Sequence, residues 1–151
     1  MTKKKDLQRK LIFLAEKQIG KPYKFGAKLK EAPNIFDCSS FIQYLFKKIG
    51  IDLPRTALQQ AHFGKKVKIS NLEPGDLIFL KRKWGHYNPE YPQGIGHVAM
   101  YIGDNMIIHA FSKESTKRKA KTGKVKGKVA KDTLKNYLKN EKPVVIKRIL
   151  K

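Results

Sequence analysis

The sequence predicts an α+β domain in which N-terminal helices pack on an antiparallel β-sheet. Apolar residues recur at helical spacing from Leu7 to Ile19 and again from Phe41 to Ile49. Short apolar runs bounded by turn residues dominate the chain from Asp76 onward. Helices that come first and strands that follow are typical of α+β domains rather than of alternating α/β folds.

Two amphipathic helices are expected before residue 50, followed by a shorter one. The first helix ends at the Gly-Lys-Pro sequence of residues 20–22, because glycine and proline interrupt a helical pattern. The second begins after Asp37, whose side chain can cap the first turn, and ends at Gly50. The third is expected over residues 56–63.

The second half of the chain predicts strands joined by tight turns. Strands are expected over residues 67–70, 76–80, 97–102, 106–110 and 144–150, with a short helix after Asp132. The Gly-Asp-Asn sequence at 103–105 indicates a hairpin between two of these strands. The sequence contains no internal repeat and no linker-like boundary. We therefore expect one domain over residues 1–151, with the basic stretch 113–131 as a loop insertion.

The composition excludes several classes of protein. The chain has 151 residues, of which 40% are hydrophobic, too many for a disordered polyelectrolyte in spite of a formal charge of +22. Its apolar runs are far shorter than the roughly 20 residues that span a bilayer, so no transmembrane segment is expected. The run that begins at Leu11 is also too short for a signal peptide. The single cysteine excludes an intramolecular disulfide framework and a site of clustered thiolates.

The charge is concentrated at the two ends of the chain. Residues 1–30 hold ten basic and two acidic side chains, residues 31–112 hold nine and seven, and residues 113–151 hold fifteen and three. A solvated lysine-rich surface explains such ends without a partner, but they are equally suited to a polyanion: nucleic acid, anionic lipid or a bacterial wall polymer. The stretch 117–131 contains no aromatic side chain to stack on bases, which disfavours nucleic acid without excluding it.

Cys38 stands where a helix N-terminus can activate a nucleophile. It follows the expected cap Asp37, and the free N–H groups and dipole of a helix N-terminus stabilise an anion. Such a position can lower a thiol pKa from about 8.5 to between about 3.5 and 7.5, and the same N–H groups can stabilise an oxyanion. A free cysteine is more often a buried core residue, but the polar Asp-Cys-Ser-Ser context favours a nucleophile.

A thiol nucleophile needs a base, and two histidines are the best candidates. His97 opens one expected strand and His109 lies near the end of the next. If residues 103–105 form a three-residue loop, the two side chains are diagonal neighbours on one face, about 7–8 Å apart at the backbone. His109 can then orient the His97 ring. A two-residue loop would place them on opposite faces. His62 is expected to be a helix-surface or packing residue, and His86, in the loop before the strand, is a candidate ligand contact. The scattered histidines do not predict a metal site.

Six short segments follow one another along the chain. They are GKPYKFG at 20–26, NIFDCSS at 34–40, LPRTALQQ at 53–60, PGDLIF at 74–79, GHVAMYIG at 96–103 and IHA at 108–110. In this order they resemble the motifs of the NlpC-type cell-wall cysteine peptidases, a papain-like family that hydrolyses amide bonds in peptidoglycan stem peptides. The sequence departs from the family pattern at Ala27 and Ser40, where glycine is frequent.

The resemblance implies a papain-like NlpC-type fold, with the helix of the nucleophile packed on an antiparallel sheet. It also implies a cysteine-type hydrolase, a peptidoglycan endopeptidase, that uses no metal or cofactor. Cys38 corresponds to the nucleophile, His97 to the base and His109 to the third member of a Cys-His-His triad.

The resemblance further implies residues that support the reaction. The Cys38 N–H and the Tyr23 hydroxyl are expected to stabilise the oxyanion, while Ser39 and Arg55 are expected to bind the substrate. The implied partner is peptidoglycan or its muropeptide fragments, cleaved at the D-γ-glutamyl linkage to the diamino acid.

Two other functions stay open at the level of the sequence. One is a non-catalytic module that uses the same fold to bind a polyanion or the cell wall, and the other is an acyltransferase or amidase with another substrate. The resemblance implies a location in the cell wall or outside the cell. The lack of a signal peptide in this chain leaves a cytoplasmic location open.

Overall fold

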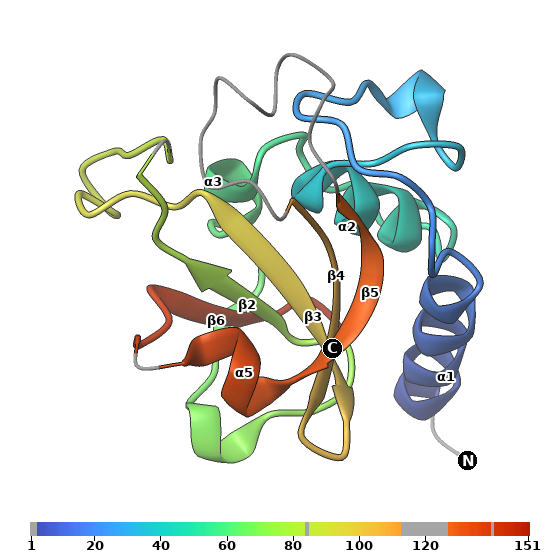
Figure 1. The fold of residues 1–151 in the computed structure, drawn as a ribbon. Helices are drawn as coiled ribbons and strands as arrows, with labels where there is room; N and C mark the ends of the chain where they lie inside the picture. Colours follow the sequence, from blue (N-terminus) through green and yellow to red (C-terminus); the bar gives the residue numbers. More distant parts are fainter. Residues whose placement is uncertain (1–2, 84, 113–126, 140) are drawn as a thin grey trace.

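The structure is a computed structural model that describes residues 3–83, 85–112, 127–139 and 141–151 (Figure 1). The α-helices among these residues are α1 (Lys3–Glu16), α2 (Cys38–Lys47), α3 (Ala57–Gln60) and α5 (Leu134–Leu138). Short 3₁₀ helices span Leu29–Glu31 and Ile69–Asn71. The strands are β1 (Lys65–Lys66), β2 (Leu77–Leu80), β3 (His97–Gly103), β4 (Met106–Ser112), β5 (Gly127–Thr133) and β6 (Val145–Arg148). Among the described helices, none is both long and apolar enough to cross a membrane.

The strands form one antiparallel sheet that separates two layers of helices. Its order is β1-β6-β2-β3-β4-β5. Alternate residues of β3 point to opposite faces, so Val98 and Met100 join the core beneath α2 while Ala99 and Tyr101 join a smaller cluster beneath α5. Figure 1 shows α1 and α2 on the side of the sheet away from α5. The α+β class predicted from the sequence is confirmed.

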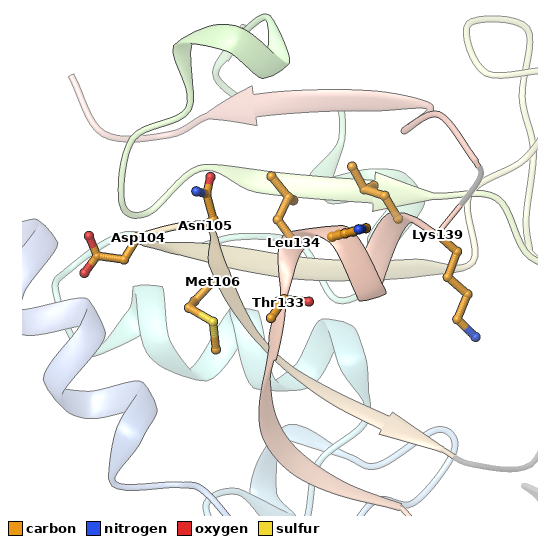
Figure 2. Close-up of a pocket in the computed structure, with 8 residues that line it drawn as sticks. Asp104, Asn105, Met106, Thr133, Leu134 and Lys139 are labelled. Atoms are coloured by element: carbon orange, nitrogen blue, oxygen red, sulfur yellow. The ribbon is translucent and has the colours of Figure 1, made fainter.

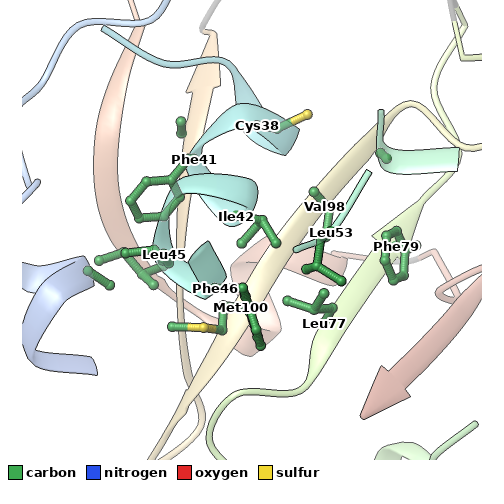
Figure 3. Packing of buried hydrophobic residues seen from close by; sticks show 14 of the residues in the cluster. Cys38, Phe41, Ile42, Leu45, Phe46, Leu53, Leu77, Phe79, Val98 and Met100 are labelled. Carbon is green, nitrogen blue, oxygen red and sulfur yellow. The ribbon is translucent and has the colours of Figure 1, made fainter. Parts of the chain in front are cut away.

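The central helix α2 forms because its sequence combines a cap with an apolar face. Phe41, Leu45 and Phe46 are completely buried against the sheet and α1, whereas the polar first turn lies at the end of this core. Figure 3 shows this packing, with Cys38 at the end of the helix and Val98 and Met100 on the strand below it. Burial of the helix face therefore fixes the position of the cysteine relative to β3.

The β3–β4 hairpin differs from the expected loop but preserves the expected pairing. Asp104 and Asn105 form a two-residue turn with φ values of 52° and 59°, as a type I′ turn requires. Gly103 pairs with Met106 and Tyr101 pairs with Ile107, so the register shifts by one residue between Gly103 and Tyr101. The extra residue on β3 restores the register that a three-residue loop would give. We expected a two-residue loop to place His97 and His109 on opposite faces of the sheet. That expectation is wrong, because the bulge returns them to the same face.

Three other expected elements differ from the structure. The strand predicted at 67–70 is absent: β1 pairs with β6 over two residues, and a 3₁₀ helix begins at Ile69. The third helix is shorter than the predicted 56–63. Residues 127–131, assigned to a loop insertion, belong to β5, which pairs with β4 along its full length. Residues 113–126 of that predicted insertion lie outside the described residues.

A pocket of about 430 Å³ lies between the β3–β4 turn and α5 (Figure 2). Its lining comprises Asp104, Asn105, Met106, Thr133, Leu134, Lys135, Leu138 and Lys139. This pocket contains none of the residues that the sequence singles out for chemistry, so the candidate site is elsewhere.

Candidate active site

Cys38 is the first residue of α2, and a capping box fixes the turn that carries it. The Asp37 carboxylate accepts a hydrogen bond from the Ser40 N–H at 2.8 Å, and the Asp37 N–H donates to Ser40 Oγ at 2.9 Å. The cysteine is 8% exposed. Its sulfur points out of the apolar cluster on the side where β3 begins (Figure 3). The cap therefore presents the thiol at the edge of the core.

The environment of the thiol favours its neutral form. Burial raises the pKa of Cys38 to about 12, and the Asp37 carboxylate adds to the rise. The backbone N–H groups of Val98 and Ser39 and the Arg55 guanidinium act in the opposite direction. The lowered pKa that a helix N-terminus can produce is therefore not found. The nearby donors do not replace the water that a thiolate loses on burial.

His97 and His109 form a buried hydrogen-bonded pair. His97 Nε2 lies 2.8 Å from His109 Nδ1, and the ring centroids are 5.0 Å apart. The exposed fractions of the two residues are 9% and 8%. The bulge in the hairpin places both side chains on the same face, so the contact arises from the register described above. The interaction that the sequence predicted between these residues is present.

Both imidazoles are held neutral near pH 7. Burial is the main cause that lowers the pKa of His97 well below its ordinary value, and His109 and Arg82 lower it further. Burial lowers the pKa of His109 to about 4, with Asp132 acting in the opposite direction and Arg82 in the same one. A neutral imidazole can accept a proton, as a general base requires.

Acid is expected to destabilise the fold through this pair. The folded pKa of His109 is about 4 and the ordinary value is 6.5, so the unfolded chain binds more protons between these pH values. The free energy of unfolding should therefore be fully retained above pH 6.5 and decrease as the pH falls towards 4. Urea denaturation across this range measures the slope. The His109→Gln variant should show a smaller slope, and an unchanged slope would contradict the assignment.

Arg55 ties three polar groups together beside the cysteine. Its Nη2 lies 2.6 Å from Asp37 Oδ2 and also donates to the Ala27 carbonyl, while Nη1 donates to Ser39 Oγ at 2.9 Å. The Gly26 N–H donates to Asp37 Oδ2 at 3.1 Å. Ser39 is buried, so its hydroxyl supports Arg55, whereas the Arg55 side chain keeps 32% of its surface exposed. The network holds the helix cap, and part of the Arg55 side chain stays exposed.

Tyr23 comes from the loop after α1 and lies close to this network. Its backbone forms a parallel bridge with Phe36, two residues before Cys38. Burial raises the pKa of the Tyr23 hydroxyl, and the charges of Cys38 and Asp37 raise it further. The hydroxyl therefore stays protonated and can donate a hydrogen bond.

Asp37 is expected to stabilise the fold, because it caps α2 and pairs with Arg55. The Asp37→Ala change removes the helix cap and leaves Arg55 without its carboxylate, which should cost about 2–3 kcal/mol. Asp37→Asn keeps an acceptor for the cap and should lose less. Chemical denaturation of the two variants measures the difference. Equal stability of the alanine variant and the parent chain would show that the network contributes nothing.

The structure brings together some of the predicted residues directly. His97 contacts His109, and Arg55 contacts Ser39. The Cys38 thiol lies against the Val98 N–H, the backbone position next to His97. A hydrogen bond between the thiol and the His97 ring is not among those formed by the described residues.

The two remaining histidines lie apart from this pair. His62 is paired with Glu90 at 2.5 Å, and the backbone of His86 pairs with Ile95. In the part of the chain that the structure describes, no three His, Cys, Asp or Glu side chains gather as metal ligands would.

Two aromatic residues next to the imidazoles received no role from the sequence. Phe111 stacks on His109 with centroids 4.7 Å apart, and Tyr137 contacts both imidazole rings. The strand pattern extends to Phe111, whose ring lies on the same face as His109 two residues earlier, so period-two alternation could have identified this neighbour. No comparable signal marks Tyr137, because its contact depends on where α5 packs.

Comparison with known proteins relates this arrangement to one family. The sequence profile described as the NlpC/P60 family matches residues 20–138. A Listeria innocua protein named "Probable endopeptidase p60" is 39% identical over 100 residues, 66% of this chain and 19% of that relative. The "Gamma-DL-glutamyl hydrolase" of Bacillus subtilis is 40% identical over 101 residues, 66% of this chain and 22% of that relative. The chain thus spans about a fifth of the length of these curated relatives.

Solved structures show the same fold. An NlpC/P60 family protein from Bacillus cereus matches with a TM-score of 0.70 at 28% identity, over 95% of this chain and 40% of that chain. NlpC1 from Trichomonas vaginalis matches with a TM-score of 0.71 at 24% identity, over 97% of this chain and 45% of that chain. Since the family profile extends from the loop after α1 to the end of α5, this chain belongs to the NlpC/P60 family.

Proposed function

We propose that this chain is a cysteine peptidase that hydrolyses amide bonds in the stem peptides of peptidoglycan. The observation that carries the proposal is a helix-capped cysteine beside the start of β3, where a neutral His97–His109 pair is buried. The names of the family relatives, endopeptidase and hydrolase, support the same reaction class. The chain matches only about a fifth of the length of those relatives, so their activity is assigned to this chain as a proposal.

The proposed reaction begins with transfer of the thiol proton to His97. In the tautomer that we propose, Nε2–H of His97 donates to His109 Nδ1 across their 2.8 Å contact, which leaves Nδ1 of His97 free to accept that proton. The Cys38 sulfur attacks the amide carbonyl as the proton leaves, since the resting thiol is neutral. His97 then returns the proton to the departing amine. Water attacks the resulting thioester with His97 as the base, and this step releases the carboxylic acid and restores the thiol.

Other residues support this reaction in the proposal. The Cys38 N–H and the protonated Tyr23 hydroxyl donate hydrogen bonds to the oxyanion. The partly exposed Arg55 side chain binds a substrate carboxylate through its guanidinium, while its bonds to Asp37 and Ser39 keep it in place. Ser39 acts on the substrate through Arg55, because its own hydroxyl is buried.

The proposed bond is the D-γ-glutamyl linkage to the diamino acid of the stem peptide. A γ-glutamyl substrate carries a free α-carboxylate at the other end of the glutamate from the scissile γ-amide, and a partly exposed arginine side chain suits such a group. The name of the Bacillus subtilis relative, a gamma-DL-glutamyl hydrolase, is consistent with this bond type.

The basic ends of the chain are proposed to hold the enzyme on an anionic wall polymer. Residues 1–30 and 113–151 carry 25 of the 34 Lys and Arg side chains. Neutralising basic residues within 117–128 should weaken binding to cell walls at low salt and spare cleavage of a small soluble peptide. Most of that segment lies outside the described residues, so its charge alone supports the prediction.

The proposal is tested by incubating the protein with purified peptidoglycan. Release of new free amines, with products that end in a new carboxylate, is the expected result. Sedimentation of the protein with the wall but no amine release would instead identify a binding module. Transfer of the acyl group to an added amine in place of water would identify an acyltransferase.

A further inference from the structure

Tyr137 contacts both imidazoles of the pair proposed for catalysis. Its ring centroid lies 5.8 Å from that of His97 and 5.3 Å from that of His109, where the two planes are nearly perpendicular at 87°. The side chain comes from α5 and is 6% exposed. These separations are typical of packed aromatic rings.

The orientation of the Tyr137 ring is itself fixed. Its hydroxyl donates to the Ile78 carbonyl oxygen at 3.0 Å, on the strand next to β3. Phe111 stacks on His109 with an interplanar angle of 13°. His109 is therefore packed by one ring from its own strand and by another from α5, and His97 is packed by His109 and Tyr137.

We propose that Tyr137 is a positioning residue whose ring fixes the orientation of the His97–His109 pair and excludes water from it. This inference rests on the roles proposed above for the two histidines. Their 2.8 Å hydrogen bond requires both imidazole planes to keep one orientation. Loss of the Tyr137 ring would leave space into which either imidazole can turn and water can enter.

Charged and titratable groups surround this cluster from several elements. Arg82 follows β2, Asp132 lies on β5, Glu141 follows α5, and Cys38 begins α2. Burial nevertheless has the largest effect on both histidines and lowers the pKa of each. Removing the Tyr137 ring should therefore raise the pKa of both imidazoles while these other groups stay in place.

The test compares Tyr137→Leu and Tyr137→Phe with the control Tyr101→Leu. Tyr101 is a buried tyrosine of the same core cluster, and its hydroxyl oxygen accepts the Asn105 N–H at 3.1 Å. It forms none of the described ring contacts with the imidazoles. Two quantities are measured for each variant: the imidazole titration by NMR and the pH dependence of kcat/KM on a muropeptide.

Tyr137→Leu is expected to shift the titration of His97 and His109 to higher pH and to move the acid limb of kcat/KM with it. Misorientation of the base should lower kcat/KM about tenfold or more above that limb. Tyr137→Phe keeps the ring and loses only the hydrogen bond to Ile78, so its shift should be much smaller than that of Tyr137→Leu. If Tyr137→Leu does not fold, Tyr137→Met, whose unbranched side chain adapts to irregular spaces, should show the same shift.

The inference is overturned if the leucine variant titrates like the parent chain, or if Tyr101→Leu shifts the histidines equally. The NMR titration requires no turnover. A parent chain without hydrolase activity but with the expected titration shift would refute the proposed function and leave the role of Tyr137 standing.

Discussion

Replacing Cys38 by alanine is expected to abolish amine release from peptidoglycan, with kcat/KM reduced about 10⁴-fold or more. The sulfur is the atom that bonds to the substrate carbonyl in the proposed reaction, and no other cysteine is present to replace it. Alanine keeps the backbone N–H at the helix start. Binding of the substrate should therefore be retained while turnover is lost.

A matched control separates this effect from unfolding. Ser39→Ala changes the adjacent buried residue and removes the hydroxyl that Arg55 binds, but it leaves the thiol intact. It should keep measurable activity, and both variants should show the circular dichroism spectrum of the parent chain. Undiminished hydrolysis by Cys38→Ala would eliminate Cys38 as the nucleophile.

Replacing His97 by glutamine is expected to lower kcat about 10³-fold, within the range for loss of a general base. Glutamine can retain a hydrogen bond to His109 but cannot take the thiol proton at neutral pH. The effect should fall on kcat more than on KM, because the imidazole acts during proton transfer.

His62→Gln is the matched control for the His97 variant. His62 pairs with Glu90 at the molecular surface and is absent from the buried pair. Its replacement should leave kcat within about a factor of two, since surface changes away from a site have small effects. Equal losses in the two variants would show that the buried pair has no special role.

The parts of the candidate site that depend on local chemistry could be predicted from the sequence. Asp37, Ser40 and the apolar face from Phe41 specify a capped helix, so the position of Cys38 could be inferred without coordinates. The hairpin signal brought His97 and His109 onto paired strands, and that pairing is present.

The details that escaped prediction depend on interactions between distant segments. The turn contains two residues rather than three, and the bulge that compensates for it has no clear sequence signal. Strand β5 escaped because its lysines obscure the alternation around Val129, which is completely buried. Gly127 permits the close pairing at its start, since a Cβ there would lie 2.2 Å from the Phe111 carbonyl oxygen.

The electrostatics of the site also required the structure. A helix N-terminus favours a thiolate, but the burial of Cys38 outweighs that preference and raises its pKa to about 12. Likewise, the contact of Tyr137 with the imidazoles arises from packing of α5 across the sheet, which local sequence does not encode.

The most direct measurement is mass spectrometry of a defined muropeptide after incubation with the parent chain and, in parallel, with Cys38→Ala. Two products are expected from the parent chain: a fragment that ends in D-glutamate with a newly freed γ-carboxylate, and a fragment that begins with the free amine of the diamino acid. Cys38→Ala should return the substrate intact. Intact substrate in both reactions, cleavage at a different bond, or the same two products from Cys38→Ala would contradict the account.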